Sequence, residues 1–276
     1  MQYKLLCTDM DGTLLTSDKK ITERTKRAIE LAHEKGVKIA VSTGRMFNSA
    51  YYYADLIGVK APVISANGAF IREKDRDKVI YKSNLGYNNC KKIVNILGKY
   101  DICPHFHTPN SIFSGDLVHS SKIYSELNKY LPPNCQIAIN IVNEWDKVFR
   151  DNEEDIVKCI GVDDDIEKVK KAKEELLCLG GIEVVSSYSN NFEIMAKGVS
   201  KGRGVELLAG FYGLTPEEII CVGDNENDIS MIEYAGLGVA MGNAEEEVKA
   251  IAQFITETND CDGVAKVIEK FILGSK

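Results

Sequence analysis

Both ends of this chain alternate short apolar, β-prone runs with segments whose apolar residues recur at helical spacing. The apolar runs are Lys4–Thr8, Val37–Val41, Pro62–Ser65, Ile219–Val222, Leu237–Ala240 and the shorter Phe254–Ile255. Strands that alternate with helices predict right-handed βαβ units, in which helices cover both faces of a parallel sheet. We therefore expect an α/β fold with a doubly wound parallel sheet.

The first helix of this pattern has clear end signals. Thr22 is a suitable N-cap, and Gly36 is a suitable stop for a helix over Thr22–Lys35. Ala28, Ile29 and Ala32 fall on one face of that helix, which we expect to point inward. Further helices are expected near the other end of the chain, over Asn227–Tyr234, Ala244–Ala252 and Val264–Ile272, with a helical turn at Thr215–Glu218.

The middle of the chain has a different character. It holds three of the four histidines, the single tryptophan and strands of mixed spacing, separated by helical patterns such as Asn89–Lys99 and Ile166–Leu177. Segments such as Gln136–Val142 and Ile182–Ser187 read as strands that pair antiparallel. A chain of 276 residues is long enough for about two domains. We expect a core made of residues 1–83 and 192–276, with an α+β domain inserted at 84–191.

Charge and cysteine usage exclude several classes of function. The net charge is −7 and no Lys/Arg tract stands out, so a nucleic-acid partner is not expected. The eight cysteines form no CxxC pair, which favours thiols in a reducing cytosol. No signal peptide and no run of about 20 apolar residues is present, so we expect a cytoplasmic protein without a membrane partner.

Polar residues beside glycine follow every core strand that the pattern identifies. These strand ends are Asp9–Thr13, Ser42–Arg45, Ala66–Gly68 and Gly223–Asp228. Ligands of an open parallel sheet bind beyond the carboxyl ends of its strands. One such end would be a turn, but four together predict a site.

Asp9 and Asp11 form the first pair of carboxylates at these strand ends. Side chains two residues apart in extended structure share a face, although an ordinary Asp-Gly turn would explain the same residues. Two carboxylates at a phosphate centre repel the substrate unless a cation neutralises them, and Mg²⁺ prefers such hard oxygen ligands. Asp224 and Asp228 are candidate further ligands, with helix capping as the alternative.

An EF-hand is excluded for this second acidic segment. Ile229 occupies the position of the required glycine, and Ala235 occupies that of the bidentate glutamate. Thr43 and Gly44 offer a hydroxyl and an unobstructed N–H at the start of a helix, which suits an anion or a simple N-cap. Lys201 lies in a segment without the spacing of a Walker A loop, so a solvated lysine at a helix start is its alternative reading.

Taken in order, these residues resemble the four motifs of the haloacid dehalogenase superfamily of phosphotransferases. The matches are DMDGT at Asp9–Thr13, STGR at Ser42–Arg45, the lysine of GVSKG at Lys201 and GDNEND at Gly223–Asp228. The likeness is closest to the Cof-type phosphatases, whose TGR, NGA and GVSKG signatures are similar to Thr43–Arg45, Asn67–Ala69 and Gly198–Gly202. That family has a Rossmann-like core and a large α+β cap between its second and third motifs, where the unusual middle lies.

The resemblance implies a role for each matched residue. Asp9 would be the nucleophile that forms an aspartyl-phosphate, and Asp11 would act as general acid and then general base. Mg²⁺ would be held by Asp9, the backbone carbonyl of Asp11 and Asp224, with Asp228 in support through water or Lys201. The implied phosphate-binding residues are Met10, Thr43, Gly44, Lys201 and Asn227, with Arg45 and Asn67 as supporting residues.

The function implied is Mg²⁺-dependent hydrolysis of small phosphorylated metabolites, with sugar phosphates first. Two other functions stay open. A sugar phosphomutase or phosphotransferase would use the same Asp9 chemistry, and a catalytically silent regulator would bind phosphate or Mg²⁺ without turnover. The intact set of nucleophile and acid disfavours the silent regulator.

His105 and His107 are the most suggestive residues of the middle segment. In a strand they share a face. They read as surface or interface histidines, as part of a Cys/His metal site that lacks a fourth ligand, or as contacts to the non-phosphate end of the substrate. The run Asp163–Asp165 reads as the cap of the helix that starts at Ile166.

Overall fold

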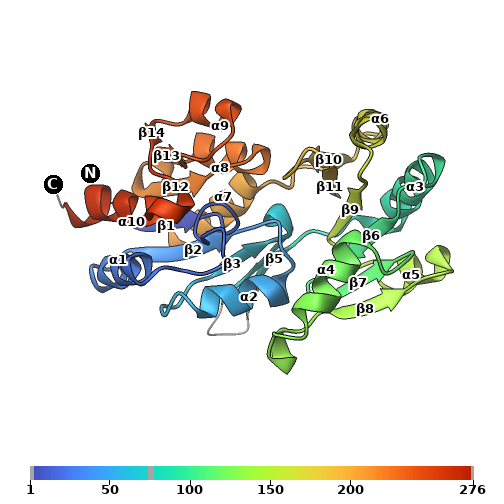
Figure 1. Ribbon diagram of the computed structural model, residues 1–276, viewed down its shortest axis with the longest axis horizontal. Coiled ribbons are helices and arrows are strands. Elements are labelled where there is room, and N and C mark those ends of the chain that lie inside the picture. The colour runs from blue at the N-terminus through green and yellow to red at the C-terminus, as the bar shows by residue number, and fades with distance from the viewer. Residues whose placement is uncertain (1–2, 74–77, 275–276) are drawn as a thin grey trace. The chain divides into compact units, whose positions relative to one another are not determined.

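A computed structural model describes residues 3–73 and 78–274 of the chain, which forms two compact units (Figure 1). Unit 1 contains the segment up to Gly44, Tyr53–Tyr81 and the segment from Ser200 onward, and unit 2 contains Arg45–Tyr52 and Lys82–Val199. The second division falls later than the expected boundary at 191/192, because the strand over 191–196 pairs within the sheet of unit 2. Residues 45–52, expected in the core, group with unit 2 as well.

Unit 1 is built on an eight-stranded sheet in the order β14-β13-β12-β1-β2-β3-β4-β5. The strands are β1 (Leu5–Thr8), β2 (Lys38–Ser42), β3 (Val63–Ser65), β4 (Phe70–Arg72), β5 (Val79–Lys82), β12 (Ile219–Gly223), β13 (Leu237–Ala240) and β14 (Phe254–Ile255). The pairs from β14 through β3 are all parallel, whereas β4 returns antiparallel to β3. The expected α/β fold with a parallel sheet is confirmed.

The central strands of this sheet are apolar because both of their faces are covered. Leu5 and Cys7 of β1 pack in one cluster with α7 (Lys201–Tyr212) and α8 (Ile229–Tyr234), while the alternate residue Leu6 points to the other face and is also buried. There α1 (Glu23–Glu34) contacts β2 and packs against α10 (Gly263–Ile268). Thr22 caps α1 as expected, since its hydroxyl accepts a hydrogen bond from the backbone N–H of Thr25.

The order of strands reverses at β1: β2 and β3 lie on one side of it, and β12, β13 and β14 lie on the other. In a parallel sheet this arrangement opens a space beyond the carboxyl ends of the two neighbouring strands. The 3₁₀ turns η1 (Ala66–Gly68) and η4 (Glu226–Asp228) stand at the same edge, after β3 and β12. The sheet therefore gathers there the polar segments that follow its strands.

Unit 2 is a six-stranded sheet in the order β10-β11-β9-β6-β7-β8. Its strands are β6 (Pro104–His107), β7 (Ser111–Ser114), β8 (Ala138–Ile141), β9 (Lys158–Val162), β10 (Ile182–Val185) and β11 (Asn191–Ala196). Four of the five pairs are antiparallel, as expected, but β7 and β8 are parallel. That part of the expectation is wrong, because α4 (His119–Leu127) lies between the two strands and returns the chain to its starting side.

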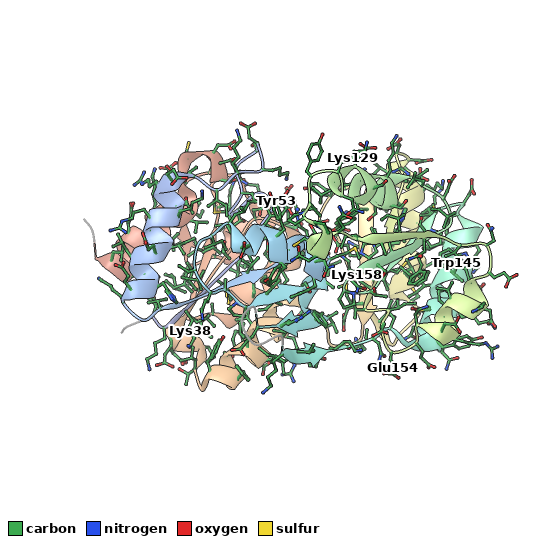
Figure 2. The ribbon with its side chains drawn as sticks, turned by 90° about the horizontal axis from the view of Figure 1, so that it is seen from below. Lys38, Tyr53, Lys129, Trp145, Glu154 and Lys158 are labelled. Atoms are coloured by element: carbon green, nitrogen blue, oxygen red, sulfur yellow. The ribbon has the colours of Figure 1, made fainter. Side chains whose placement is uncertain are left out.

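One face of this second sheet is apolar. Phe106 of β6 packs with residues of α3 (Gly86–Lys99), α5 (Trp145–Asp151) and α6 (Ile166–Leu177). Trp145, labelled in Figure 2, has its ring centroid 5.4 Å from that of Phe106. Asp165 caps α6 by accepting hydrogen bonds from the backbone N–H groups of Glu167 and Lys168, as expected. The other face of the sheet carries polar side chains.

The remaining helices are short. They are α2 (Phe47–Asp55) and α9 (Glu246–Ile251), with 3₁₀ or π turns at Pro133–Cys135, Pro216–Glu218, Asn259–Cys261 and Glu269–Leu273. None of the helices in the described ranges combines the length and the apolar composition that crossing a bilayer requires.

Candidate active site

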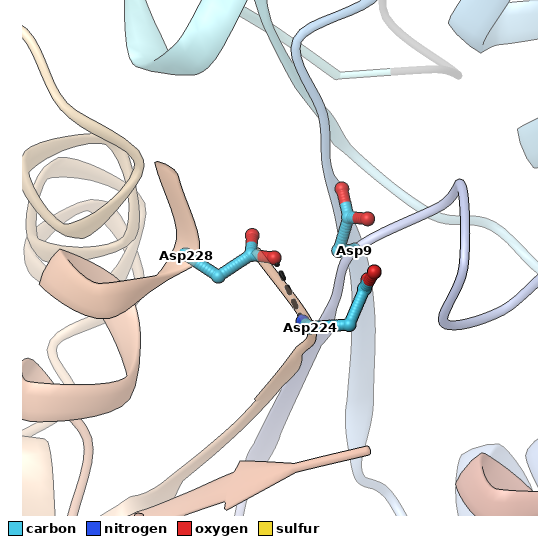
Figure 3. Close-up of side chains that lie close together, drawn as sticks. All are labelled: Asp9, Asp224 and Asp228. Atoms are coloured by element: carbon cyan, nitrogen blue, oxygen red, sulfur yellow. Dashed lines mark hydrogen bonds between the residues drawn. The ribbon is translucent and has the colours of Figure 1, made fainter. Parts of the chain in front are cut away.

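The ends of β1 and β12 are joined directly at the edge of the unit 1 sheet. The backbone N–H of Asp9 donates a 2.9 Å hydrogen bond to the carbonyl of Val222, which continues the parallel ladder by one residue. Asp9 and Asp224 are thus the first residues beyond two neighbouring strands, β1 and β12. Figure 3 shows their carboxylates, with that of Asp228, directed toward a common space.

Asp224 is held by hydrogen bonds on both carboxylate oxygens. Thr13 Oγ1 donates to Oδ1 over 2.6 Å, and Asn225 Nδ2 donates to Oδ2 over 2.7 Å. Both donors come from the segments that also contain the candidate catalytic residues. Because the two bonds fix the plane of the carboxylate, Asp224 keeps one orientation when its surroundings change.

Gly12 permits this close approach. Its φ is +81°, and a Cβ built on it would lie 2.4 Å from Asp224 Oδ2. Any other residue would both strain the backbone and displace the carboxylate. Position 12 thus requires glycine both for its backbone conformation and for the space that the Asp224 carboxylate occupies.

Lys201 lies between two of the carboxylates. Its Nζ donates to Asp9 Oδ1 over 2.7 Å and to Asp228 Oδ1 over 2.6 Å, and its side chain is 1% exposed. Asp228 Oδ2 accepts the backbone N–H groups of Asp224 and Asn225, and Figure 3 marks the first of these bonds. The solvated-lysine reading is thus wrong. The charged start of α7 is buried because Gly202 packs its backbone closely against Ser230.

The electrostatics of the cluster leave excess negative charge. Burial raises the pKa of Asp9 well above its usual value, Lys201 opposes this shift, and Asp228 and Asp224 add to it. Burial and the neighbouring Asp228 raise the pKa of Asp224 to about 7. Burial alone would lower the pKa of Lys201, but its two carboxylate partners hold it above the usual value. Three acids facing one ammonium favour a further cation.

The carboxylate oxygens fit a hard divalent cation. Among the described residues, Asp9, Asp224 and Asp228 form a group of possible metal ligands, with one oxygen from each within 4.8 Å of the others. Asp228 accepts three hydrogen bonds, from Lys201 and two backbone N–H groups, whereas Asp224 accepts two and Asp9 one, so Asp9 and Asp224 keep more oxygen lone pairs for a cation. Hard oxygen donors of this kind suit Mg²⁺ better than a soft metal.

Asp11 is placed differently from Asp9. It is half-buried, at 26% side-chain exposure, and its Oδ1 accepts a 2.8 Å hydrogen bond from Lys19 Nζ. Its charge also raises the pKa of Asp224 slightly, although burial of Asp224 and Asp228 weigh more. Asp11 therefore lies at the solvent side of the cluster, within electrostatic reach of it.

Two asparagines meet beside the cluster. Asn227 Nδ2 donates to Asn67 Oδ1 over 3.2 Å, and the backbone N–H of Asn67 donates to the carbonyl of Thr43 over 3.0 Å. A Cβ on Gly68 would lie 2.2 Å from the carbonyl oxygen of Ser200, so the η1 turn packs directly on the start of α7. The turns after β2, β3 and β12 are thus linked to one another and to the helix that carries Lys201.

Four further predicted residues lie in the loops around the cluster. We expected Thr43 and Gly44 at the start of a helix. Helix α2 begins only at Phe47, so both residues lie in the loop before it. Arg45 falls in unit 2, where its Nη1 donates to Ser49 Oγ over 3.4 Å. Met10 is fully buried, and its carbonyl accepts the N–H of Leu15.

His105 and His107 are buried, so the reading of surface histidines is wrong. They face away from the apolar cluster of Phe106, on the polar face of the unit 2 sheet. Ser114 Oγ donates to the carbonyl of Asp116, so it accepts from His105 Nδ1, which fixes the protonated nitrogen and leaves Nε2 as an acceptor. Burial, with a smaller effect of His119, lowers the pKa of His105 to about 4.

The same polar face holds a buried ion pair. Lys158, labelled in Figure 2, has its Nζ 2.7 Å from Glu193 Oε2. It is also the cross-strand neighbour of His107. Burial lowers the pKa of His107, and the charge of Lys158 lowers it further. Among the described residues, His105 Nε2 and His107 Nδ1 have no hydrogen-bond partner.

Sequence reasoning gave no role to three residues that shape the site. They are Thr13, Lys19 and Asn243, whose Nδ2 donates to the carbonyl of Gly12 over 2.8 Å. Asn243 follows β13 in a Met-Gly-Asn segment, so the rule that found the other strand ends would also have found it. Lys19 carries no comparable signal, because it stands in a polar turn.

Comparison with known proteins agrees with this geometry. The model of the haloacid dehalogenase-like hydrolase family matches residues 6–268. In Bacillus subtilis, the 5-amino-6-(5-phospho-D-ribitylamino)uracil phosphatase YcsE is 31% identical over 99% of this chain and 97% of its own, and the phosphatase YwpJ is 29% identical over 98% and 100%. The solved structure of BT4131, a subclass IIB sugar phosphatase, covers 97% of this chain and 98% of its own with a TM-score of 0.81 and 27% identity.

The chain belongs to the haloacid dehalogenase-like hydrolases. YcsE and YwpJ, which match it over almost its whole length, are named phosphatases, and the carboxylates of Asp9, Asp224 and Asp228 lie together beside Lys201. It is a hydrolase that acts on phosphoric monoesters.

Proposed function

We propose that the chain is a Mg²⁺-dependent phosphatase that transfers the phosphoryl group of a small metabolite to Asp9 and then to water. One observation carries the proposal. Carboxylate oxygens of Asp9, Asp224 and Asp228 lie within 4.8 Å of one another, and Lys201 bridges Asp9 and Asp228. A phosphate-monoester site needs this combination of a buried nucleophile and fixed positive charge.

In the first step an Asp9 carboxylate oxygen attacks phosphorus, and the ester P–O bond breaks. Asp11 gives its proton to the departing oxygen. In the second step a water molecule gives a proton to Asp11 and attacks phosphorus, which releases inorganic phosphate and restores Asp9. Lys201 holds the Asp9 side chain and supplies positive charge where the phosphoryl oxygens gather.

Mg²⁺, when bound, would offset the negative charge of the phosphoryl group and the acids. Asp9, Asp224 and the backbone carbonyl of Asp11 would hold it, and Asp228 would support it through Lys201. Met10, Thr43, Gly44, Asn227 and Lys201 would bind the phosphoryl oxygens, with Arg45 and Asn67 in support.

For the substrate we propose a small phosphorylated polyol or sugar. One relative acts on a phosphorylated ribitylamino-uracil and a structural neighbour on sugar phosphates, and both leaving groups carry several hydroxyls. We assign residues 84–191 the selection of that leaving group, with His105 and His107 as candidate contacts because each has a buried ring nitrogen without a partner among the described residues. All eight cysteines are free thiols, which supports a cytoplasmic location.

The direct test is to trap the covalent intermediate. Wild-type protein and Asp9→Asn are mixed with Mg²⁺ and p-nitrophenyl phosphate, quenched in acid and digested. The Asp9 peptide should gain the mass of one phosphoryl group in the wild type, more strongly in Asp11→Asn, and Asp9→Asn should show neither the mass nor turnover. Asp165→Asn is the control, since asparagine caps a helix as well as aspartate does.

Product analysis separates the alternatives. Free phosphate that stops with EDTA supports the phosphatase, an isomerised sugar phosphate would identify a mutase, and no turnover would identify a silent binder. A substrate panel then tests the histidines. His107→Ala should lower kcat/KM for the preferred polyol phosphate but not for p-nitrophenyl phosphate, while the exposed His33→Ala should change neither. An unchanged kcat/KM would remove His107 from the specificity site.

A further inference from the structure

Lys19 contacts the residue to which the proposed reaction assigns proton transfer. Its Nζ lies 2.8 Å from Asp11 Oδ1, close enough for a charge-assisted hydrogen bond. Lys19 belongs to the turn after Leu15 and reaches back across eight positions to Asp11. Most exposed ion pairs contribute little interaction free energy. The Lys19–Asp11 contact can therefore orient Asp11 only if other contacts hold the lysine in place.

The backbone at Lys19 is in an unusual conformation. Its φ is +59°, in the left-handed region that side-chain-bearing residues rarely adopt. Two backbone hydrogen bonds close the turn, from Thr16 N–H to the Lys20 carbonyl and from Lys19 N–H to the Thr16 carbonyl. Such strain persists where the surrounding structure fixes it, and it is commoner at functional sites.

The turn is anchored to a second segment of unit 1. Both the backbone N–H and the hydroxyl of Ser17 donate to the Asp260 carboxylate, over 2.8 and 2.7 Å. Asn259 Nδ2 donates to the carbonyl of Leu15 over 2.9 Å. These contacts hold the turn on both sides of Thr16, so the backbone that carries the Lys19 side chain is held in one position.

We propose that Lys19 is a positioning residue, whose ammonium group fixes the rotation of the Asp11 carboxyl group for proton transfer to the leaving oxygen. The proposal rests on the proposed function. In the step concerned, the O–H bond of Asp11 breaks and the proton passes to the ester oxygen as the P–O bond breaks. Lys19 donates a hydrogen bond to Asp11 and loses no proton.

Leaving-group dependence distinguishes this role from general attraction of an anionic substrate. An alkoxide needs a proton as it departs, whereas p-nitrophenolate leaves with little help. The ratio kcat/KM covers only the steps up to formation of the covalent intermediate, so it isolates this proton transfer from the later hydrolysis. A residue that orients Asp11 should therefore matter for alkyl phosphates and not for p-nitrophenyl phosphate.

The experiment compares Lys19→Met, Lys19→Arg and the control Lys20→Met, an exposed lysine in the same turn. Lys19→Met should lower kcat/KM about tenfold for a sugar phosphate and by less than about twofold for p-nitrophenyl phosphate. Lys19→Arg should restore most of the loss, and Lys20→Met should change neither ester. Equal losses on both esters, or no loss on either, would overturn the proposal.

Two further measurements complete the test. In an Asp11→Asn background, Lys19→Met should have no additional effect on kcat/KM, and a further loss would show that Lys19 does not act through Asp11. A crystal structure of Lys19→Met needs no turnover. In that structure the Asp11 carboxyl group should be rotated away from its wild-type position, and an unmoved Asp11 would overturn the proposal about Lys19. This outcome does not depend on turnover. A wild type that hydrolysed neither ester would instead refute the proposed function.

Discussion

Thr13 Oγ1 and Asp224 Oδ1 are 2.6 Å apart, although 211 positions separate the two residues along the chain. The contact exists because β1 and β12 are adjacent parallel strands, so the residues beyond their ends arrive at one edge. Thr13 is not expected to touch the substrate. Its role is to fix a carboxylate that we assign to the metal.

Thr13→Val should weaken Mg²⁺ binding about 10- to 100-fold, because partners that orient a ligand typically have effects of that size. Titration calorimetry with Mg²⁺, or the Mg²⁺ dependence of turnover, measures the change. The matched control is Thr25→Val, which removes another buried hydroxyl, in α1, away from the carboxylates. An Mg²⁺ affinity equal to that of the wild type would show that Thr13 does not orient Asp224.

Gly12→Ala and Gly36→Ala separate backbone strain from displacement of Asp224. Both glycines have positive φ, +81° and +86°, but a Cβ on Gly36 meets nothing within 4 Å. Each variant should lose about 1–2 kcal/mol of unfolding free energy from strain. Only Gly12→Ala should also lose turnover, since its Cβ would push Asp224 aside. Similar activities in the two variants would contradict this.

Stability in the absence of metal should fall as pH rises. The pKa of Asp224 is about 7 in the folded state against an ordinary value near 4, and the pKa of Asp9 is raised in the same direction. Between these values the folded state binds more protons than the unfolded state, so the free energy of unfolding decreases from about pH 4 to pH 7. The main cause is the burial of the ionised acids, and their mutual repulsion adds to it.

Mg²⁺ should reverse this loss, because it binds the ionised carboxylates. The Mg²⁺-induced rise in Tm should thus be larger at pH 8 than at pH 5, with NaCl at equal ionic strength as the control. Asp224→Asn should remove most of the difference. A rise of the same size at both pH values would argue against a metal site at these acids.

Unit 2 should lose stability in acid. The pKa of His105 is about 4 in the folded state, below the ordinary 6.5, and the pKa of His107 is lowered as well. As pH falls from 6.5 toward 4 the unfolded state takes up protons that the folded state does not, so His105 alone costs up to about 3 kcal/mol of unfolding free energy, and His107 acts in the same direction. Urea unfolding followed by the fluorescence of Trp145, the single tryptophan, reports on this unit.

His105→Asn should reduce this acid sensitivity, because asparagine keeps a donor near the position of Nδ1 but does not titrate. The exposed His33→Asn in α1 is the control and should leave the pH profile of Trp145 unchanged. A profile in His105→Asn identical to that of the wild type would show that His105 is not the group that titrates.

The sequence allowed prediction of elements whose signal is local. β13 and α6 have the predicted bounds, because the continuous apolar run of a buried strand and the aspartate cap of a helix are both local features of the sequence. The strand ends could be predicted as a group, since a parallel sheet brings all its carboxyl ends to one edge. The parallel pairing of β7 with β8 could not, because register depends on where α4 returns the chain.

Contacts between distant segments lay beyond the sequence as well. Without the family resemblance, which placed Lys201 at the site, its segment predicted a solvated lysine, because nothing nearby shows that Asp9, 192 positions away, will share its burial. His105 and His107 read as surface residues because a polar alternation normally marks a solvent face, whereas here α4 covers them: Ser120 Oγ lies 3.4 Å from His107 Nε2. In each case the missing information was what packs against the residue.

The anchoring of the Lys19 turn to Asn259 and Asp260 bears on how the protein matures during translation. Asp9 and its loop are translated early, but Asp260 follows its partner Ser17 by 243 positions and Asn259 follows Leu15 by 244. A nascent chain therefore carries Asp9 for most of its synthesis without Asp224 or these anchoring residues. The contacts of Asp9 with its neighbours beyond β12, and the anchored form of the Lys19 turn, can therefore form only after the ribosome has passed this late segment.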